Sequence, residues 1–162
     1  MLKKLIILSK YFLFTFRSTL IFAIDTPKGL IIKDLEKSEA NIEVAYDDRI
    51  WVHYTGWVFD KNIDTKNYCE AKGEKFDSTK EKPFRENPGV FSFTIGKGLV
   101  IPGWELGLLK MKKGSKRCLV IPHQLAYGPR SFPKIPAYST LIFEVELIKI
   151  KKKAQIKKRN NL

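Results

Sequence analysis

Aromatic and glycine residues recur in a fixed order over the second half of this chain, and they indicate what chemistry it can do. The segments are GWELGLLKMKKG, LAYG, IP and STLIFEVEL, all between Gly103 and Leu147. They predict an apolar cup with Trp104 as its floor. Metal-binding or nucleophilic patterns are absent, since the two cysteines lack zinc-type spacing and the only histidines are His53 and His123. We expect both histidines to be structural or exposed, with no general-base role.

Three earlier segments complete the pattern: VHYTG at 52–56, FDS at 76–78 and FSFTIGKGLVIPGW at 91–104. In order and spacing, the seven segments resemble the FKBP-type peptidyl-prolyl cis-trans isomerases, the macrolide-binding immunophilins. The resemblance implies an isomerase that acts on X-Pro bonds of folding polypeptides and needs no cofactor or metal. Its implied partners are proline-containing polypeptides and rapamycin-like macrolides. We expect a monomer, because no dimerising helix precedes the domain.

The same resemblance assigns the residues of the cup. It implies catalytic roles for Tyr54, Phe76, Asp77, Tyr127 and Phe143. It implies substrate contacts from Phe91, Val100, Ile101, Trp104 and Ile135. In this scheme the Ile101 backbone N–H and the Tyr127 hydroxyl donate hydrogen bonds to substrate carbonyls. Asp77 is the one acid at an apolar edge.

Rotation about an X-Pro bond makes and breaks no covalent bond, so the implied chemistry needs neither nucleophile nor metal. Its barrier is ~18–20 kcal/mol because the amide C–N bond has partial double-bond character. A catalyst must bind the twisted amide more tightly than either planar form. Twisting shrinks the amide dipole, so an apolar pocket disfavours the planar state relative to the transition state. Aromatic walls also hold the pyrrolidine ring.

Each of these residues also has an ordinary structural interpretation. Taken singly, Phe91, Trp104 and Phe143 at strand or helix spacing are more often core residues. Asp77 before Ser78 is compatible with a turn or a cap. The order and spacing of the seven segments, rather than any single residue, favour the pocket.

The chain departs from the family pattern outside the cup. It is longer than the shortest members between residues 60 and 76, and again between residues 77 and 91. The second insertion hides the basic residue that usually partners the pocket acid, and Arg85 is the candidate. Phe132 stands near where a histidine is common. These departures leave open an alternative function, a binding module or chaperone that holds proline peptides without turnover.

Alternating apolar residues predict an α+β fold in which an antiparallel sheet, a half-barrel, wraps around one short helix. Period-two patterns predict strands at 50–55, 91–95, 118–121 and 141–147, with weaker ones at 29–35 and 42–46. Pro102 opens the single helix, and Gly114 is expected to end it. Residues 61–75 and 80–89 are expected as polar loops.

The net charge of +13 is concentrated at the two ends of the chain. Residues 29–148 carry 18 Lys and Arg against 16 Asp and Glu. The domain is therefore nearly neutral, and we expect no specific nucleic-acid partner. These counts and patterns divide the chain into a leader at 1–24, lead-in strands at 25–49, an isomerase domain at 50–150 and a disordered basic tail at 151–162.

The leader has the positive start and apolar run of a secretory signal, with Ala23 as a cleavage position. It predicts export to the periplasm or out of the cell. A retained membrane anchor is the alternative, and the basic tail offers a second contact with an anionic membrane.

Cys69 and Cys118 are the only cysteines. An oxidising compartment permits a bridge between them, but the sequence does not show whether the two sulfurs meet. Unpaired thiols are slightly favoured.

Overall fold

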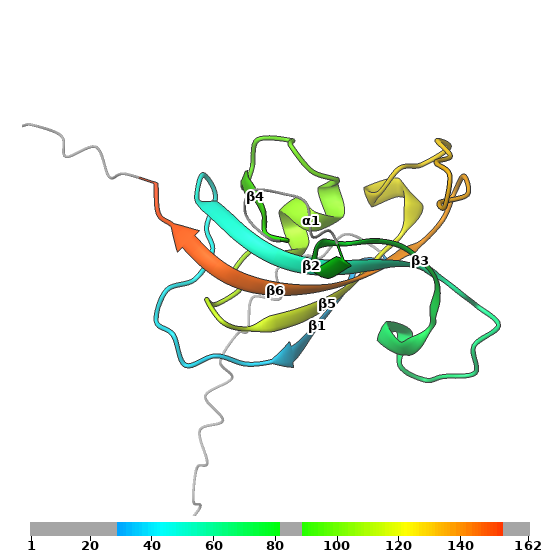
Figure 1. The fold of residues 1–162 in the computed structure, drawn as a ribbon, viewed down its shortest axis with the longest axis horizontal. Coiled ribbons are helices and arrows are strands. Elements are labelled where there is room, and N and C mark those ends of the chain that lie inside the picture. The colour runs from blue at the N-terminus through cyan, green and yellow to red at the C-terminus, as the bar shows by residue number, and fades with distance from the viewer. Residues whose placement is uncertain (1–28, 82–88, 154–162) are drawn as a thin grey trace, which may run out of the picture.

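The computed structural model describes residues 29–81 and 89–153. The elements follow the order β1 (Ile31–Glu36), β2 (Arg49–Phe59), η1 (Tyr68–Glu70), β3 (Lys72–Ser78), η2 (Thr79–Glu81), β4 (Phe91–Thr94), α1 (Pro102–Gly107), β5 (Lys116–Ile121), η3 (His123–Leu125) and β6 (Leu141–Lys151), where η marks a short 3-10 helix. The strands form one antiparallel sheet in the order β1-β5-β6-β2-β3, and β4 also pairs with β2 (Figure 1). The predicted α+β fold, a curved antiparallel sheet with one short helix, is confirmed.

The two longest strands, β2 and β6, lie side by side at the centre of the sheet. Their register pairs Gly56 with Phe143 and Tyr54 with Val145. Because side chains alternate between the two faces of a strand, Tyr54 and Phe143 project from the same face as diagonal neighbours. Residue alternation in two distant segments therefore brings two predicted pocket residues together.

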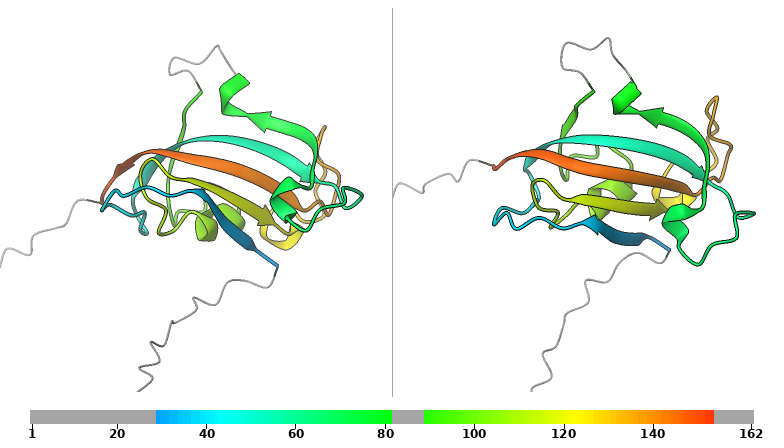
Figure 2. Two further views of the ribbon diagram at one scale, coloured as in Figure 1. Left: turned by 90° about the horizontal axis from the view of Figure 1, so that it is seen from below. Right: turned by 60° about the horizontal axis from the view of Figure 1, so that its bottom comes forward.

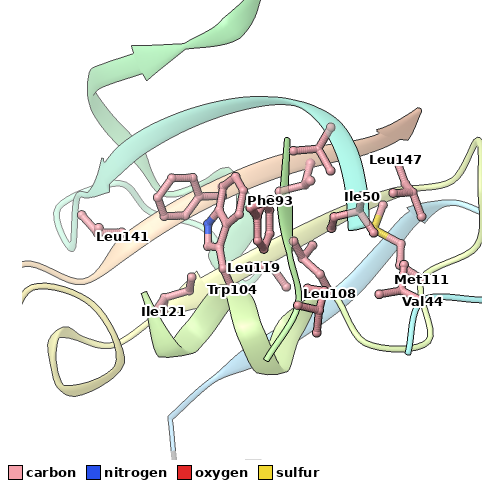
Figure 3. Packing of buried hydrophobic residues seen from close by; sticks show 14 of the residues in the cluster. Val44, Ile50, Phe93, Trp104, Leu108, Met111, Leu119, Ile121, Leu141 and Leu147 are labelled. Atoms are coloured by element: carbon pink, nitrogen blue, oxygen red, sulfur yellow. The ribbon is translucent and has the colours of Figure 1, made fainter. Parts of the chain in front are cut away.

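Helix α1 packs against the same face of the sheet, directly over β5 (Figure 2). Gly103 and Gly107 make this close approach feasible. A Cβ added at Gly103 would lie 2.3 Å from Ile121, and one at Gly107 would lie 2.6 Å from Leu119. The Trp104 indole projects from α1 toward the sheet, among buried residues of β4 and β5 (Figure 3).

The helix is shorter than the sequence predicts, and Gly114 does not end it. It ends at Gly107, after which Lys110 has a positive φ of 60°. The chain turns away because the Lys110 N–H donates to the Val44 carbonyl, and the Val44 N–H donates to the Met111 carbonyl. The predicted apolar face is still correct although the helix is shorter, because the side chains of Trp104, Leu108 and Met111 are all buried.

The buried guanidinium of Arg117 also holds this end of the helix. Its Nη1 donates to the carbonyls of Gly107 and Leu109, at 2.9 Å in each case. Its Nε donates to Asp34 Oδ1 at 2.7 Å. Arg117 therefore links β5, the C-terminal end of α1 and β1.

Two predictions for the segments around the core are wrong. Residues 42–46 form no strand, and their only ladder contact is an isolated bridge between Glu43 and Lys112. The predicted loop at 61–75 contains η1, and its last four residues belong to β3. Pairing of β3 with β2 imposes strand structure on a segment whose composition is polar.

A second, smaller core covers the opposite face of the sheet. It contains the buried residues Cys69, Ala71, Cys118, Val120 and Ile142. Cys69 and Cys118 form a disulfide, so the preference for unpaired thiols is wrong. The long β2–β3 connection folds back under β5 and brings the two sulfurs together, an arrangement that no local pattern reports. Figure 2 shows η1 and α1 on opposite faces of the sheet.

The folded region extends further toward the C-terminus than predicted. Strand β6 reaches Lys151. The Lys152 ammonium donates to Asp48 at 2.6 Å, and that of Lys153 donates to Asp47 at 2.6 Å. Residues 151–153 are therefore ordered, whereas the rest of the predicted tail and the leader lie outside the described residues. No helix within the described ranges is long and apolar enough to cross a membrane.

Candidate functional site

A cavity of ≈ 190 Å³ opens at the N-terminal end of α1. We call it the cup. Nine of the ten predicted site residues line it, and the tenth lining residue is Leu99; the full set is Tyr54, Phe76, Asp77, Phe91, Leu99, Val100, Ile101, Trp104, Tyr127 and Phe143. The residues come from β2, β3, β4, α1, β6 and two connecting segments. Segments that span 54–143 in the sequence thus converge on one hollow.

Trp104 lies where aromatic rings from three strands meet. Its ring centroid is 5.1 Å from that of Tyr54, 5.2 Å from Phe143 and 6.1 Å from Phe91, and each pair is arranged edge to face. Such pairs stabilise each other beyond the area that they bury. Trp104 Nε1 is buried and has no hydrogen-bond partner among the described residues. The centre of the cup therefore consists of packed aromatic rings, with the indole N–H of Trp104 as a polar atom among them.

A further wall consists of Phe76 and Phe143, whose centroids are 5.5 Å apart. Both rings lie directly over Gly56 of the VHYTG segment. A Cβ at this position would lie 2.6 Å from the Phe76 ring and 2.9 Å from the Phe143 ring. Glycine is therefore required at position 56 for steric reasons, because a side chain there would occupy the space of the Phe76 and Phe143 rings.

Asp77 is held in place by hydrogen bonds. The Tyr54 hydroxyl donates to its Oδ2, and the Ser78 backbone N–H donates to Oδ1 at 2.9 Å. Because the bond to Tyr54 joins β2 to β3, it fixes both the carboxylate and one aromatic wall. Arg85, the candidate basic partner of Asp77, lies outside the described residues.

Two donors at the rim have no hydrogen-bond partner within the described ranges: the Ile101 backbone N–H and the Tyr127 hydroxyl. Burial raises the pKa of Tyr127, and the negative charge of Asp77 raises it further. The phenol therefore stays protonated, and able to donate, through the neutral pH range. Both residues line a cavity whose other lining residues are mostly apolar.

Glu105 anchors the loop that forms this rim. Its carboxylate accepts hydrogen bonds from the backbone N–H groups of Gly96 and Gly98, the latter at 2.9 Å. The sequence predicts Glu105 only as a favourable charge near the helix N-terminus, and it does not predict this role. It also misses Leu99, which is 64% exposed and lines the cup. The sequence signal for Leu99 was its position directly before Val100, a predicted site residue.

Ile135 is the one predicted site residue that does not line the cavity. It is buried in the main core, and its backbone pairs with that of Phe132. The histidines also lie outside the cup: His53 Nδ1 is 3.1 Å from the Gly89 carbonyl, and the His123 ring contacts Tyr138. Among residues 29–81 and 89–153, no group of His, Cys, Asp and Glu is arranged to hold a metal ion.

Comparison with known proteins identifies close sequence relatives. Residues 40–148 match the family described as FKBP-type peptidyl-prolyl cis-trans isomerase. The chain is 43% identical over 106 residues to FK506-binding protein 1 of Aspergillus oryzae, covering 65% of this chain and 85% of that protein. It is 41% identical over 123 residues to the FK506-binding protein of Neisseria meningitidis serogroup B, covering 75% and 96%. It is 44% identical over 110 residues to peptidyl-prolyl cis-trans isomerase FKBP2 of Mus musculus, covering 67% and 66%.

Proposed function

The chain belongs to the FKBP-type peptidyl-prolyl cis-trans isomerase family, and we propose that it isomerises X-Pro bonds of polypeptides within the cup around Trp104. One observation carries the choice of site. An aromatic cavity of ≈ 190 Å³ has two donors at its rim, Ile101 N–H and the Tyr127 hydroxyl, that bind no described group. An apolar pocket with a few orienting donors suits a proline ring and its flanking carbonyls.

In the proposed mechanism the pyrrolidine ring packs on Trp104 and the amide loses its water. Desolvation disfavours the planar amide, whose dipole is large, more than the twisted amide. The donors of Ile101 and Tyr127 hold the carbonyls on either side, so that rotation occurs about one bond of a fixed substrate. The chain's own contribution is therefore binding, orientation and exclusion of water.

Asp77 and Tyr54 contribute rigidity in this mechanism. The carboxylate accepts hydrogen bonds from Tyr54 and Ser78, so its orientation is set before substrate arrives. Fixed dipoles stabilise a transition state without the cost of reorganisation during the reaction. We propose that Asp77 acts as a fixed charge at the mouth of the cup, not as a proton acceptor.

The test is a proline-limited peptide or refolding assay with the double variant Asp77→Leu, Phe143→Tyr. This variant removes the fixed charge and places a hydroxyl on an apolar wall. We expect kcat/KM to fall at least tenfold, which corresponds to ~1.4 kcal/mol of transition-state binding. Circular dichroism and thermal unfolding serve to check that the variant is folded. A folded variant with the wild-type rate would refute the proposal.

A second candidate function is binding of proline peptides or macrolides without turnover. The observation that favours it is the contact of the exposed Phe132 with Tyr127, at a centroid distance of 4.7 Å. This ring lies against one of the two rim donors. Stoichiometric binding of a rapamycin-like macrolide with no acceleration of a proline-limited reaction would favour the second function. Acceleration would exclude it.

We also propose that the protein is exported and acts as a monomer on unfolded clients. The secretory pattern of the leader supports export, and so does the Cys69–Cys118 disulfide, because such bonds persist in oxidising compartments. N-terminal sequencing of the protein recovered from a periplasmic or secreted fraction tests this proposal. A mature N-terminus shortly after Ala23 is expected, and an intact Met1 in the cytoplasmic fraction would contradict it. Sedimentation velocity tests the monomer.

A further inference from the structure

A second, shallower hollow of ≈ 690 Å³ lies beside the cup. We call it the groove. It runs between the rim loop at 98–101 and the segment at 124–130. Both segments lie on the same face of the sheet as α1 (Figure 1). The groove therefore lies on the same side of the sheet as the helix.

The groove and the cup share one wall. Leu99, Val100, Ile101 and Tyr127 line both hollows. Two of these residues carry the free rim donors, so a polypeptide whose carbonyls reach those donors lies at the boundary between cup and groove. By contrast, Phe76 and Asp77 line the cup alone. Asp77 is therefore a residue of the cup and not of the groove.

The groove has one charged residue, the exposed Arg130. The Arg130 backbone N–H donates to the Tyr127 carbonyl at 3.2 Å, which closes a turn and ties the position of Arg130 to the rim donor. Within the part of the chain that the structure describes, the guanidinium forms no ion pair. Leu99, which is 64% exposed, supplies apolar surface opposite.

We propose that the groove binds the polypeptide chain on one side of the proline, and that Arg130 selects substrates with an acidic residue there. The inference rests on the proposed function of the cup. An extended chain spans at most ~3.3–3.6 Å per residue. When a proline is bound in the cup, the residues on either side of it must therefore lie on the surface next to the cup. Apolar contact with Leu99 holds this chain, and a carboxylate complements the uncompensated guanidinium.

Arg130 is the charged residue of the groove. A polypeptide that places an acidic residue in the groove brings a carboxylate to this guanidinium. One that places a lysine there brings a second cation to Arg130, and like charges oppose each other. The site therefore distinguishes substrates by where their charge lies relative to proline.

The test compares peptides of one length with a single proline and one variable residue, Glu, Gln or Lys, at each of three positions before and after it. We expect a two- to fivefold higher kcat/KM for Glu than for Lys, the size of effect that an exposed ion pair supports. The preference should occur on one side of the proline only. It should also shrink as salt is raised from 0.05 to 1 M, as screening requires.

The decisive variant is Arg130→Glu, with Lys134→Glu as its matched control. Lys134 is an exposed cation in the same connecting segment that lines neither the cup nor the groove. The Glu-to-Lys ratio of kcat/KM is taken within each protein, so that changes in overall activity cancel. Arg130→Glu should reverse the ratio, and Lys134→Glu should leave it as in the wild type.

The outcomes separate this inference from the function on which it rests. Wild-type protein that isomerises the Gln peptides but shows no charge preference, or a preference that survives Arg130→Glu, would overturn the role of Arg130. Wild-type protein that isomerises none of the peptides would instead overturn the proposed function of the cup. Equal ratios in Arg130→Glu and Lys134→Glu would attribute any preference to net charge and not to the groove.

Discussion

Removal of the Glu105 carboxylate should loosen the rim of the cup. Glu105 lies in the first turn of α1 and accepts hydrogen bonds from the N–H groups of Gly96 and Gly98. These glycines begin the loop that carries residues 99–101 to the cavity. In Glu105→Ala both N–H groups lose their partner, and the loop that positions the Ile101 donor loses its anchor to the helix.

The size of the effect follows from the kind of hydrogen bond. A hydrogen bond to a charged group contributes ~1.5–3 kcal/mol. Both bonds of Glu105 lie at the surface, so we assign ~1 kcal/mol to each and expect the free energy of unfolding to fall by ~2 kcal/mol. For a domain of this size, that loss lowers Tm by roughly 5–10 °C. If the same loss reaches the transition state, kcat/KM falls by at most ~30-fold.

Thermal unfolding and a proline-limited peptide assay measure the two consequences separately. KM should rise, because a mobile Ile101 N–H binds the substrate carbonyl less well. Glu105→Gln retains one acceptor oxygen for two donors, and it should lose about half as much stability. Glu39→Ala is the control, since Glu39 is exposed and forms no hydrogen bond or ion pair within the described residues. If Glu105→Ala matched Glu39→Ala in both Tm and kcat/KM, the anchoring role of Glu105 would be wrong.

Three further predictions concern stability. The Cys69–Cys118 bridge spans 49 residues, so the double alanine variant should lose ~4 kcal/mol in urea unfolding; a loss below ~1 kcal/mol would contradict this estimate. Arg117→Met leaves the carbonyls of Gly107 and Leu109 without their donor and should cost ~3 kcal/mol. Arg117→Lys should not restore it, because one ammonium cannot reproduce the fork, and full rescue would show that charge alone suffices. Hydrogen bonds from Lys153 and Lys97 lower the pKa of Asp47 from 3.8 to about 2. A carboxylate with a depressed pKa stabilises the folded state above pH 3.8 and loses this effect as the pH falls toward 2. Between pH 5 and pH 2, wild-type protein should therefore lose more stability than Asp47→Asn, and equal losses would show that these ion pairs contribute nothing.

Local patterns predict the orientation of those cup residues that lie in regular elements. Alternation along β2 and β6 places Tyr54 and Phe143 on the core face whatever the neighbouring strands are. Pro102 marks where α1 begins and so places Trp104 in its first turn. The family resemblance, and not these patterns, named the nine predicted residues that line the cavity.

The residues that escaped prediction act across long distances in the sequence. Leu99 lies in an irregular loop, where residue periodicity gives no information on the direction of a side chain. The end of α1 depends on Arg117 and Val44, which the fold brings to the helix from either side. Ile135 matches the family position, yet it packs in the core.

By itself the sequence determined the apolar faces, the start of the helix and the set of aromatic residues, because these depend on residue type and on spacing within a few neighbours. Only the tertiary structure decided what covers each face: the disulfide between Cys69 and Cys118, the hold of Glu105 on the rim loop and the groove beside Tyr127. The physical reason is that the spacing of apolar residues shows which face of a helix or strand is buried. Which segment covers that face depends on contacts between residues that are distant in the sequence.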